Sequence, residues 1–581
     1  MRSGQVALAT VVMLACVGCA SAQELAPAQA ELDSLAERVE GFQVIELPAE
    51  GDVGLRVAAS LTIDDLRGVT LDDDPPVLGE LPDDLDPRMA DDWPPGEAPY
   101  VAQGIEPFRF RWFTNEFSYG GWHNWGMIDY AATRGFNVLY PCNRDPQTWT
   151  EVPEGTRWLR WGGLVNWDTW LPEHGIPDGR YDQLAGMDLL GLMLQEEKLA
   201  HDARFDQLMI DMEHGVLPPE RLREQEWYPP GASDTERAQF EKRYYDGYAQ
   251  TNIAPVEAAR QNGWRDPSIY GWQPVGRSYW GLESAEVDPA TDWAWNAFGR
   301  AIYGAVDILN PSVYCFYWTP RNVAYTLANI DLNMQLVRTM PERKPLRPYY
   351  WTLLHGGGAG ERWWQNQPIP DEDVRAMTAM CFFTGADGMV LWNWSGTGDH
   401  HHPQIEAGAY VMVATPFQAT PEGGEPQTID RYRVLLLDAV EEDGTVRFRV
   451  ADPEADNSGV TDDHPVFAMT RAELEPNLRP PSAPVAAMIE GLALVRPLEY
   501  ILSHGEVQVD VPAQRQFGED LPIVRRVSLG PWHIVATYDP GCTFGGEPRS
   551  IHLEDFAGHA GLTLELPADA QTRIFVLQEP Q

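Results

Sequence analysis

The stretch FDQLMIDME (205–213) begins as an apolar, β-prone run and ends in two acids, Asp211 and Glu213. Side chains of a strand alternate between its two faces, so these two carboxylates lie on the same face. The sequence therefore predicts a strand that presents a pair of acids at its C-terminal end. What such a pair can do depends on the fold that surrounds it.

Seven further runs resemble this one and alternate with helical segments. The eight apolar, β-prone runs are 108–114, 136–142, 157–165, 205–213, 268–273, 307–317, 348–354 and 387–394. Segments with a helical apolar period lie between them, at 186–203, 233–262, 290–306, 323–340 and 371–384. This order predicts an α/β fold, a (β/α)8 TIM barrel over residues 107–505. A doubly wound sheet is the second interpretation, disfavoured because no glycine-rich phosphate loop follows the first run.

The segments around the predicted barrel differ from it in character. Residues 396–480 carry strand signals, so we expect a β-rich insertion after strand eight and a delayed last helix at 483–505. Residues 506–581 are β-prone throughout and predict a C-terminal β-sandwich. Residues 23–106 are rich in Pro and Asp, and we expect an acidic N-terminal extension with some β structure.

Residues 1–22 are typical of an export signal. Arg2 precedes an apolar core, and Ala20-Ser21-Ala22 offers a small-residue cleavage site. The mature chain would then begin near Gln23 and be secreted or periplasmic. A cell-envelope lipoprotein anchored through Cys19 is the alternative. No later stretch has the about 20 uninterrupted apolar residues that a membrane span needs.

Charge and composition exclude several classes of protein. The 581 residues include 42 Lys and Arg against 87 Asp and Glu, which gives a net charge of -45. Binding to duplex nucleic acid needs a basic surface, so we expect no nucleic-acid partner. The sequence is 44% hydrophobic with 22 Trp, far too apolar for a disordered chain.

Strand ends at the C-terminal face of a barrel carry the reactive groups of barrel enzymes, so they define the candidate site. Asp211 and Glu213 are the candidate catalytic residues, one as a general acid and the other as a charged neighbour. Candidate substrate-binding residues at the other strand ends are Asn115, Glu116, Trp272, Tyr314, Trp318, His355 and Trp392. Flat aromatic side chains with polar neighbours suit the faces of sugar rings. We expect no cofactor and no metal site, and we interpret His400-His401-His402 as a solvated cluster.

Several of these blocks together resemble the hyaluronidase family of glycoside hydrolases. They are Ile210-Asp211-Met212-Glu213, Pro311-Ser312-Val313-Tyr314, the run GADGMVLW (385–392) and the Gly162-Gly163 turn. Chitinase-like barrels have a related strand-four pattern, D-G-x-D-x-D-x-E, of which this chain keeps Asp206, Asp211 and Glu213.

The resemblance implies a retaining, substrate-assisted cleavage of a polysaccharide or oligosaccharide. In it Glu213 protonates the leaving oxygen, Asp211 orients and stabilises the N-acetyl group of the sugar, and Tyr314 and Trp392 shape the pocket. The chain departs from the family at Met212, where hyaluronidases place an aromatic residue. The β-rich insertion and the C-terminal sandwich are also outside the usual catalytic unit, and these departures concern the substrate rather than the barrel.

Two alternatives stay open at this point. The first is a two-carboxylate glycosidase on the same barrel, with Glu213 as the acid and Glu116, Asp168 or Asp399 as the second carboxylate. The second is a cell-surface barrel that binds carbohydrate without turnover.

Overall fold

The structure of the protein is a computed structural model. It describes residues 22–48, 55–76, 101–119, 125–141, 153–164, 179–212, 215–274, 282, 285, 287–317, 319–355, 368–393, 405–431, 433–451, 464–478, 484–519, 521–542, 547–554, 556 and 561–580. Several predicted features lie outside these residues: the export signal up to Ser21 with Cys19, the His400-His401-His402 cluster, and the residues Glu213, Asp168, Asp399 and Trp318.

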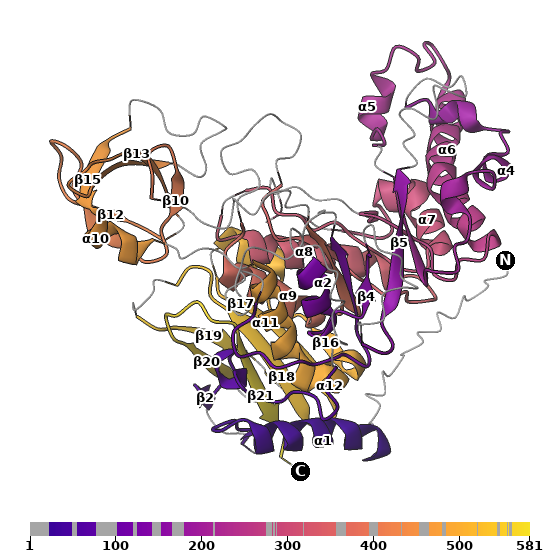
Figure 1. The fold of residues 1–581 in the computed structure, drawn as a ribbon. Coiled ribbons are helices and arrows are strands. Elements are labelled where there is room, and N and C mark those ends of the chain that lie inside the picture. The colour runs from indigo at the N-terminus through magenta and orange to yellow at the C-terminus, as the bar shows by residue number, and fades with distance from the viewer. Residues whose placement is uncertain are drawn as a thin grey trace, which may run out of the picture.

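A seven-stranded parallel sheet forms the centre of the molecule (Figure 1). Its spatial order is β7-β6-β5-β4-β3-β9-β8, so strands that follow one another in the chain are mostly neighbours. The strands are β3 (Thr114–Tyr119), β4 (Val138–Leu139), β5 (Arg157–Leu164), β6 (Gln207–Asp211), β7 (Ser268–Ile269), β8 (Tyr349–Trp351) and β9 (Gly388–Asn393). Six of them fall in predicted runs two to five, seven and eight. The prediction for run one, 108–114, was wrong in its bounds, because β3 begins only at Thr114, the last residue of that run. The described chain thus contains a parallel half-barrel of the TIM type.

The predicted sixth strand, 307–317, pairs with β8 only at isolated points. Leu309 bridges Leu346 and Ser312 bridges Tyr349, both in parallel. Between these bridges lies Pro311, which accepts a hydrogen bond from the Tyr349 N–H at 2.8 Å but has no N–H of its own to donate. The missing donor explains why this segment does not form a continuous ladder.

Helices connect the strands and cover the outer face of the sheet. They are α2 (Trp125–Ala132), η2 (Tyr181–Leu184), α4 (Leu189–Met193), η3 (Glu197–Leu199), α5 (Pro219–Arg223), α6 (Asp234–Gln261), the π-helical turn η5 (Trp295–Gly299), α7 (Arg300–Ala305), α8 (Asn322–Val337) and α9 (Asp371–Phe382). The longest, α6, begins at a capping box in which Ser233 and Glu236 satisfy each other's backbone N–H groups. Elements α4 to α7 stand together as a helical lobe beside β5 (Figure 1).

The last helix of the sheet arrives after a long interruption, as its sequence position predicts. Helix α11 (Pro484–Val495) packs against α9, and η8 (Arg496–Leu498) and α12 (Glu499–His504) follow it. A Cβ atom at Gly491 would lie 2.7 Å from Thr378 Cβ and 2.8 Å from the Arg375 carbonyl oxygen. Only glycine therefore allows α11 to approach α9 this closely.

The β-rich segment between β9 and α11 folds around a hydrophobic core of its own. It contains β10 (Tyr410–Met412), β11 (Phe417–Ala419), β12 (Gln427–Ile429), β13 (Val434–Val440), β14 (Thr445–Ala451), β15 (Val466–Thr470), α10 (Arg471–Leu474) and η7 (Glu475–Asn477). Strands β10, β13, β14 and β15 form an antiparallel sheet, and the rings of Phe448 and Phe467 stack on it at 5.4 Å. The buried Arg431 connects this unit to the main body through an ion pair with Glu372 of α9 at 2.5 Å.

The N-terminal and C-terminal segments fold together. Two sheets, β1-β21-β18-β17-β16 and β19-β20-β2, share one hydrophobic cluster. Their elements are β1 (Ile45–Glu46), β2 (Leu55–Val57), η1 (Asp64–Leu66), β16 (Glu506–Gln508), α13 (Ala513–Glu519), β17 (Ile523–Leu529), β18 (Trp532–Tyr538), β19 (Arg549–Leu553), β20 (Leu562–Leu566) and β21 (Arg573–Gln578). Strand β1 pairs with β21 and β2 with β20, both in parallel. The expected N-terminal extension thus supplies one strand to each C-terminal sheet.

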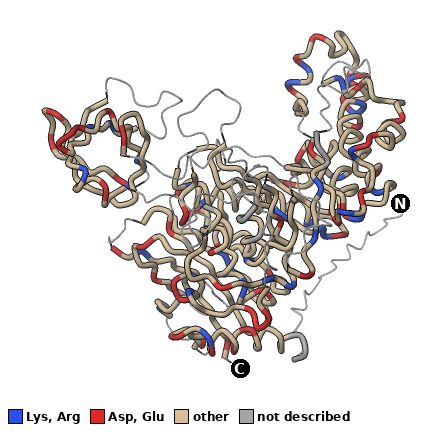
Figure 2. Tube along the Cα trace, in the orientation of Figure 1, with Lys and Arg blue, Asp and Glu red and all other residues tan. Residues whose placement is uncertain are grey.

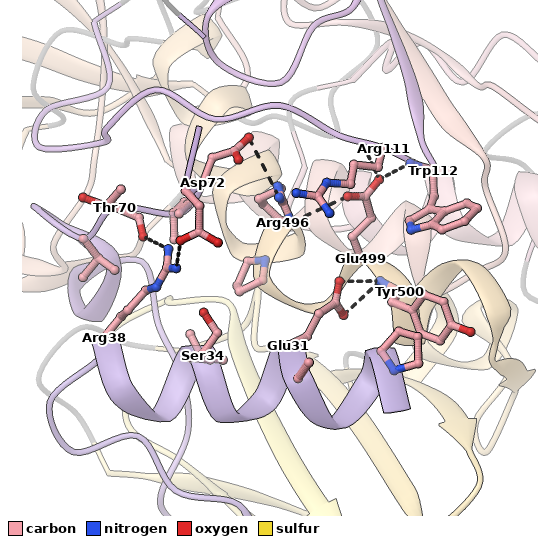
Figure 3. Close-up of a pocket in the computed structure, with 17 residues that line it drawn as sticks. Glu31, Ser34, Arg38, Thr70, Asp72, Arg111, Trp112, Arg496, Glu499 and Tyr500 are labelled. Carbon is pink, nitrogen blue, oxygen red and sulfur yellow. Dashed lines mark hydrogen bonds and ion pairs between the residues drawn. The ribbon is translucent and has the colours of Figure 1, made fainter. Parts of the chain in front are cut away.

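The same extension contains a helix that the sequence analysis did not predict. Helix α1 (Ala22–Arg38) buries Ala28, Leu32 and Leu35 and packs on η8 and α12. A cavity of about 350 Å³ lies beside it. Figure 3 shows the residues that line this cavity, with Arg496 between Asp72 and Glu499. The sequence analysis missed this helix because it judged 23–106 by the proline and aspartate that dominate the later part of the segment.

A carboxyl group of α1 is buried at this contact. Both oxygens of Glu31 accept the Tyr500 N–H, at 2.9 and 3.0 Å (Figure 3). Burial raises the pKa of Glu31 to about 8, although the Tyr500 N–H and Arg496 oppose this effect. Burial also raises the pKa of its neighbour Glu499. Helix α1 is therefore docked with Glu31 in its neutral form at neutral pH.

Acidic side chains lie mainly on the outlying parts of the molecule. Figure 2 shows them along the insertion, the helical lobe and the base near α1, whereas much of the centre carries no charge. Among the described helices, none combines the length and the apolar composition needed to cross a bilayer.

The docking of α1 predicts a pH-dependent stability. An unfolded Glu31 ionises near 4.5 and the folded one near 8, so the folded state is progressively destabilised as pH rises between these values. We expect Glu31→Gln, which keeps the hydrogen-bond acceptor, to be more stable than wild type at pH 9. One pKa unit corresponds to about 1.4 kcal/mol, so the gain amounts to a few kcal/mol. Thermal unfolding at pH 6 and pH 9 measures it.

The exposed Glu37 on the same helix provides the control, because Glu37→Gln removes a carboxyl group without changing a buried one. An equal response of the two variants at pH 9 would contradict the burial of Glu31.

Candidate active site

The inner face of the parallel sheet carries a hydrophobic cluster of its own. Its buried members are Val138, Leu159, Met209, Tyr314, Tyr349 and Val390, and Tyr140, Trp161, Tyr270, Phe316, Trp351 and Trp392 pack against them. The alternate residues of the same strands, such as Leu208 and Ile210 on β6, belong to the cluster that packs on the helices. This period of two directs every second side chain of each strand into the half-barrel.

Asp211 ends β6 on this inner face. It is 9% exposed and follows Met209 by two residues, so both side chains point inward. Strand β5 has a register irregularity opposite it, between Trp161 and Leu164, where Gly162 and Gly163 lie. The structure places Asp211 at the C-terminal end of β6, the second strand from one edge of the sheet.

Three tyrosines gather around Asp211. The hydroxyl groups of Tyr270 and Tyr314 are hydrogen-bonded at 2.7 Å, and the Tyr270 and Tyr349 rings lie edge to face at 4.8 Å. Burial raises the pKa of Tyr349 well above 10, and the nearby Glu116, Tyr270 and Asp211 add to this rise. Within the described chain the Tyr349 hydroxyl has no hydrogen-bond partner. It is thus a neutral, fully buried phenol in the interior of the half-barrel.

Tryptophans and a histidine complete the rim. The Trp161 and Trp392 rings stack at 4.7 Å with an interplanar angle of 29°. Trp351 lies edge-on to Tyr314 at 5.5 Å, and its buried Nε1–H lacks an acceptor among the described residues. Desolvation lowers the pKa of His355, which stacks on Tyr314 at 5.6 Å, so this imidazole is neutral at pH 7.

A cavity of about 650 Å³ opens beside this rim. Met212, Tyr270, Tyr314 and His355 line it on the side of the sheet. The opposite wall comes from the helical lobe, with Tyr248 and Asn252 of α6 and the aromatic residues next to η5. Its volume falls within the range of about 300–1,000 Å³ typical of small-molecule sites, and its lining of aromatic groups with a few polar ones is typical as well.

The predicted substrate-binding residues divide into two groups. Tyr314, Trp272 and His355 line the cavity, and Trp392 belongs to the inner cluster beside it. The structure does not bring Asn115 to this site. Its amide donates to the Gly135 carbonyl at 2.9 Å on the helix-facing side of β3, because it precedes the inward-facing Glu116 by one residue.

Glu116 lies inside the half-barrel, where other side chains of the barrel interior already bind its carboxylate. It is fully buried, forms an ion pair with Arg347, and accepts a hydrogen bond from Gln207 Nε2 at 3.0 Å. A carboxylate held in this way is a structural group of the barrel interior. The arrangement does not favour Glu116 as the second carboxylate of a glycosidase, whereas Asp168 and Asp399 lie outside the described residues.

Sequence reasoning missed four residues of the site: Trp161, Tyr270, Tyr349 and Trp293. The first three occupy alternate positions in predicted strands, where the period of two places them beside Val138, Met209 and Val390. That signal was present in the sequence. Trp293 belongs to the helical lobe, and only the three-dimensional packing shows that it faces the cavity.

Clusters of three or more His, Cys, Asp or Glu that could hold a metal ion do not occur among the described residues.

Comparisons with known proteins found similarity only at the level of structure. No family model and no curated protein sequence matches the chain. Bee venom hyaluronidase aligns with 34% of this chain and 67% of its own, at 19% identity and a TM-score of 0.27. A maltogenic α-amylase from Thermotoga neapolitana aligns over 80% of this chain and 96% of its own (10% identity, TM-score 0.30). A family 30 endoxylanase from Clostridium papyrosolvens aligns over 81% and 98% (10% identity, TM-score 0.21). All three are glycoside hydrolases, and a shared scaffold does not by itself specify a reaction.

The buried ion pair predicts a structural effect of mutating Glu116. Glu116→Ala leaves Arg347 buried without its partner, which lowers the free energy of unfolding by about 3–5 kcal/mol. The double variant Glu116→Ala, Arg347→Met recovers part of this loss. Asp246→Ala, which breaks the exposed Lys242–Asp246 pair, costs less than about 1 kcal/mol and serves as the control. Denaturant unfolding measures all three. Full stability of Glu116→Ala together with lost activity would instead assign Glu116 to the chemistry.

Proposed function

We propose that the protein is an exported glycoside hydrolase that cleaves a polysaccharide at the C-terminal end of the parallel sheet. The observation that carries this proposal is the position of Asp211. It ends β6, points into the half-barrel, and is followed by Met212, which lines a cavity of about 650 Å³ together with Tyr270 and Tyr314. Carboxylates that emerge among aromatic platforms suit the cleavage of sugars, which offer flat CH faces for stacking and hydroxyl groups for hydrogen bonds.

The scaffold that we infer for this site is a complete eight-position barrel. Segment 307–317 pairs with β8 on one side, and Tyr314 reaches Tyr270 beside β7 on the other. A Cβ atom at Gly271 would lie 3.5 Å from Ser312 Cβ, so the chain segments themselves are close where the ladder is missing. These contacts support a closed ring in which side chains replace backbone pairing between positions five and six.

Two carboxylates separated by one residue support a retaining, substrate-assisted reaction. We assign Glu213, two residues after Asp211 in the sequence, as the general acid that gives its proton to the leaving glycosidic oxygen. As that C–O bond breaks, the carbonyl oxygen of the sugar's own N-acetyl group bonds to the anomeric carbon. Asp211 accepts the N–H of this group and stabilises the positive charge that develops on it. Water, deprotonated by Glu213, then opens the cyclic intermediate with retention of configuration.

The neighbouring tyrosines fit this assignment. Tyr314 lines the cavity and Trp392 belongs to the inner cluster, so both border the space in which the sugar would lie. Removal from water strengthens the interactions of Asp211 with a developing charge, because the tyrosine and tryptophan rings around it lower the local dielectric.

Export is part of the same proposal. Its support is the signal-like composition of residues 1–22, and sequencing the N-terminus of the mature protein checks it, with a start near Gln23 expected.

Substitution of the two acids tests the proposed chemistry. We expect Asp211→Asn and Glu213→Gln each to lower kcat/KM by about 10²–10⁴-fold, because each removes an interaction that strengthens in the transition state. The measurement is reducing-end release from a panel of neutral, N-acetylated, sulfated and uronate-containing polysaccharides. Asp246→Asn, which alters an exposed acid on α6, serves as the matched control with wild-type rates.

The nature of the nucleophile distinguishes the substrate-assisted route from its alternatives. A thiazoline analogue of N-acetylglucosamine should inhibit competitively if the acetamido group attacks, whereas a two-carboxylate enzyme should resist it. Undiminished cleavage by Glu213→Gln would overturn the assignment of the acid. Glycan binding without cleavage by the wild type would identify a carbohydrate-binding barrel instead.

A further inference from the structure

We propose that the wall of the cavity formed by the helical lobe is a second sugar-binding subsite, which takes a neutral sugar unit next to the one that is cleaved. Its platform is Trp293, and its polar contact is the amide of Gln273, which follows β7. This inference rests on the proposed function, because it assigns the wall to the same glycan that reaches Asp211.

The cavity extends well past the tyrosine cluster. One end is lined by Tyr270 and Tyr314, and the other by Trp293 and Phe298. Cavities of this volume hold drug-sized ligands, which are larger than one pyranose ring. A single sugar at the tyrosine end, which Met212 next to Asp211 also lines, would therefore leave the lobe side of the cavity unfilled.

Trp293 is the most exposed aromatic side chain of the wall. It is 39% exposed, which is unusual for a residue of this size in a protein that buries most of its aromatic area. Its ring lies 5.6 Å from the ring of Tyr245 and 5.8 Å from that of Phe298. These two contacts hold the indole in place, so a sugar ring can stack on it without first ordering a mobile side chain.

The backbone next to Trp293 has an irregularity that fixes this position. The π-helical turn η5 begins two residues later, and π-turns occur frequently at functional sites. The turn buries Trp295 completely beside the exposed Trp293. A Cβ atom at Gly299 would lie 2.9 Å from the Trp295 ring, so this glycine permits the close packing that anchors the turn.

The described residues that line the cavity offer no positively charged Lys or Arg side chain to bind an anionic sugar. The buried Oε1 of Gln273, which follows β7, has no hydrogen-bond partner within the described part of the chain. The Asn252 amide, in contrast, donates to the Tyr248 carbonyl at 3.0 Å. The charged residue among the described lining is Asp292, next to Trp293, and neither Lys nor Arg occurs among the described lining residues. A carboxylate beside the platform repels a uronate or sulfate group, so this subsite selects an uncharged sugar.

The dependence of activity on substrate length tests the subsite. The probes are N-acetylglucosamine oligomers of two and six units and hyaluronan oligomers of the same two lengths. The measured quantity is the ratio of kcat/KM for the hexamer to that for the dimer, which reports binding beyond the cleaved unit. We expect Trp293→Ala to lower this ratio at least tenfold for the neutral series. The matched control is Trp112→Ala, which removes an exposed tryptophan beside the cavity under α1 and leaves the ratio at its wild-type value.

Each result decides between the proposal and its failure. If the wild type cleaves the oligomers and Trp293→Ala keeps the wild-type ratio, the subsite is overturned while the proposed hydrolysis stands. If the wild type cleaves none of them, calorimetric Kd values for the hexamer and dimer replace the rates. If Trp293→Ala then changes the ratio of the two Kd values, the subsite is supported although the proposed hydrolysis fails. If the ratio stays at its wild-type value, the subsite and the proposed hydrolysis are both overturned. If Trp293→Ala lowers the hexamer-to-dimer ratio more for hyaluronan than for the neutral series, the selection of an uncharged sugar is overturned.

Discussion

The hydrogen bond between the hydroxyl groups of Tyr270 and Tyr314, at 2.7 Å, spans the interval between barrel positions five and six, where the described residues show no backbone pairing. Tyr270 follows β7 at one edge of the parallel sheet, and Tyr314 lies in the segment bridged to β8 at the other edge. Because both hydroxyls also border the cavity, the contact that joins the edges is part of the site. The position of Asp211 relative to the aromatic rim depends on it.

The interior of the half-barrel contains both charged and aromatic side chains. Glu116, Arg347 and Gln207 form a buried group in which positive and negative charge compensate each other. Glu116 pairs in register with Val138 and Val390, so this group lies at the level of the inner hydrophobic cluster. Tyr270 and Tyr314 of the same inner face line the cavity and present aromatic surface to it. A ligand that stacks and hydrogen-bonds, as a sugar does, fits this combination.

Much of the central sheet could be predicted from the sequence, because strands buried on both sides are short apolar runs whose limits the composition reveals. The run 157–165 became β5 at Arg157–Leu164, and 387–394 became β9 at Gly388–Asn393. The run 108–114 preceded β3 rather than forming it, since Phe108, Phe110 and Phe113 pack as a buried aromatic cluster at the base. Strands β1 and β2 could not be assigned partners from sequence, because they pair with residues more than 500 positions away. Glu116 and Asn115 show the same limit within the site, where adjacent residues face opposite sides of one strand and only the register shows which side is the interior.

The most direct test of the account is the position of a sugar in a crystal of the Glu213→Gln protein soaked with an N-acetylglucosamine hexamer. The account predicts density for one sugar unit with its acetamido group against Asp211 and its ring among Tyr270, Tyr314 and Trp392. Density confined to the cavity beneath α1, or a sugar bound on the far side of the sheet from Asp211, would contradict it.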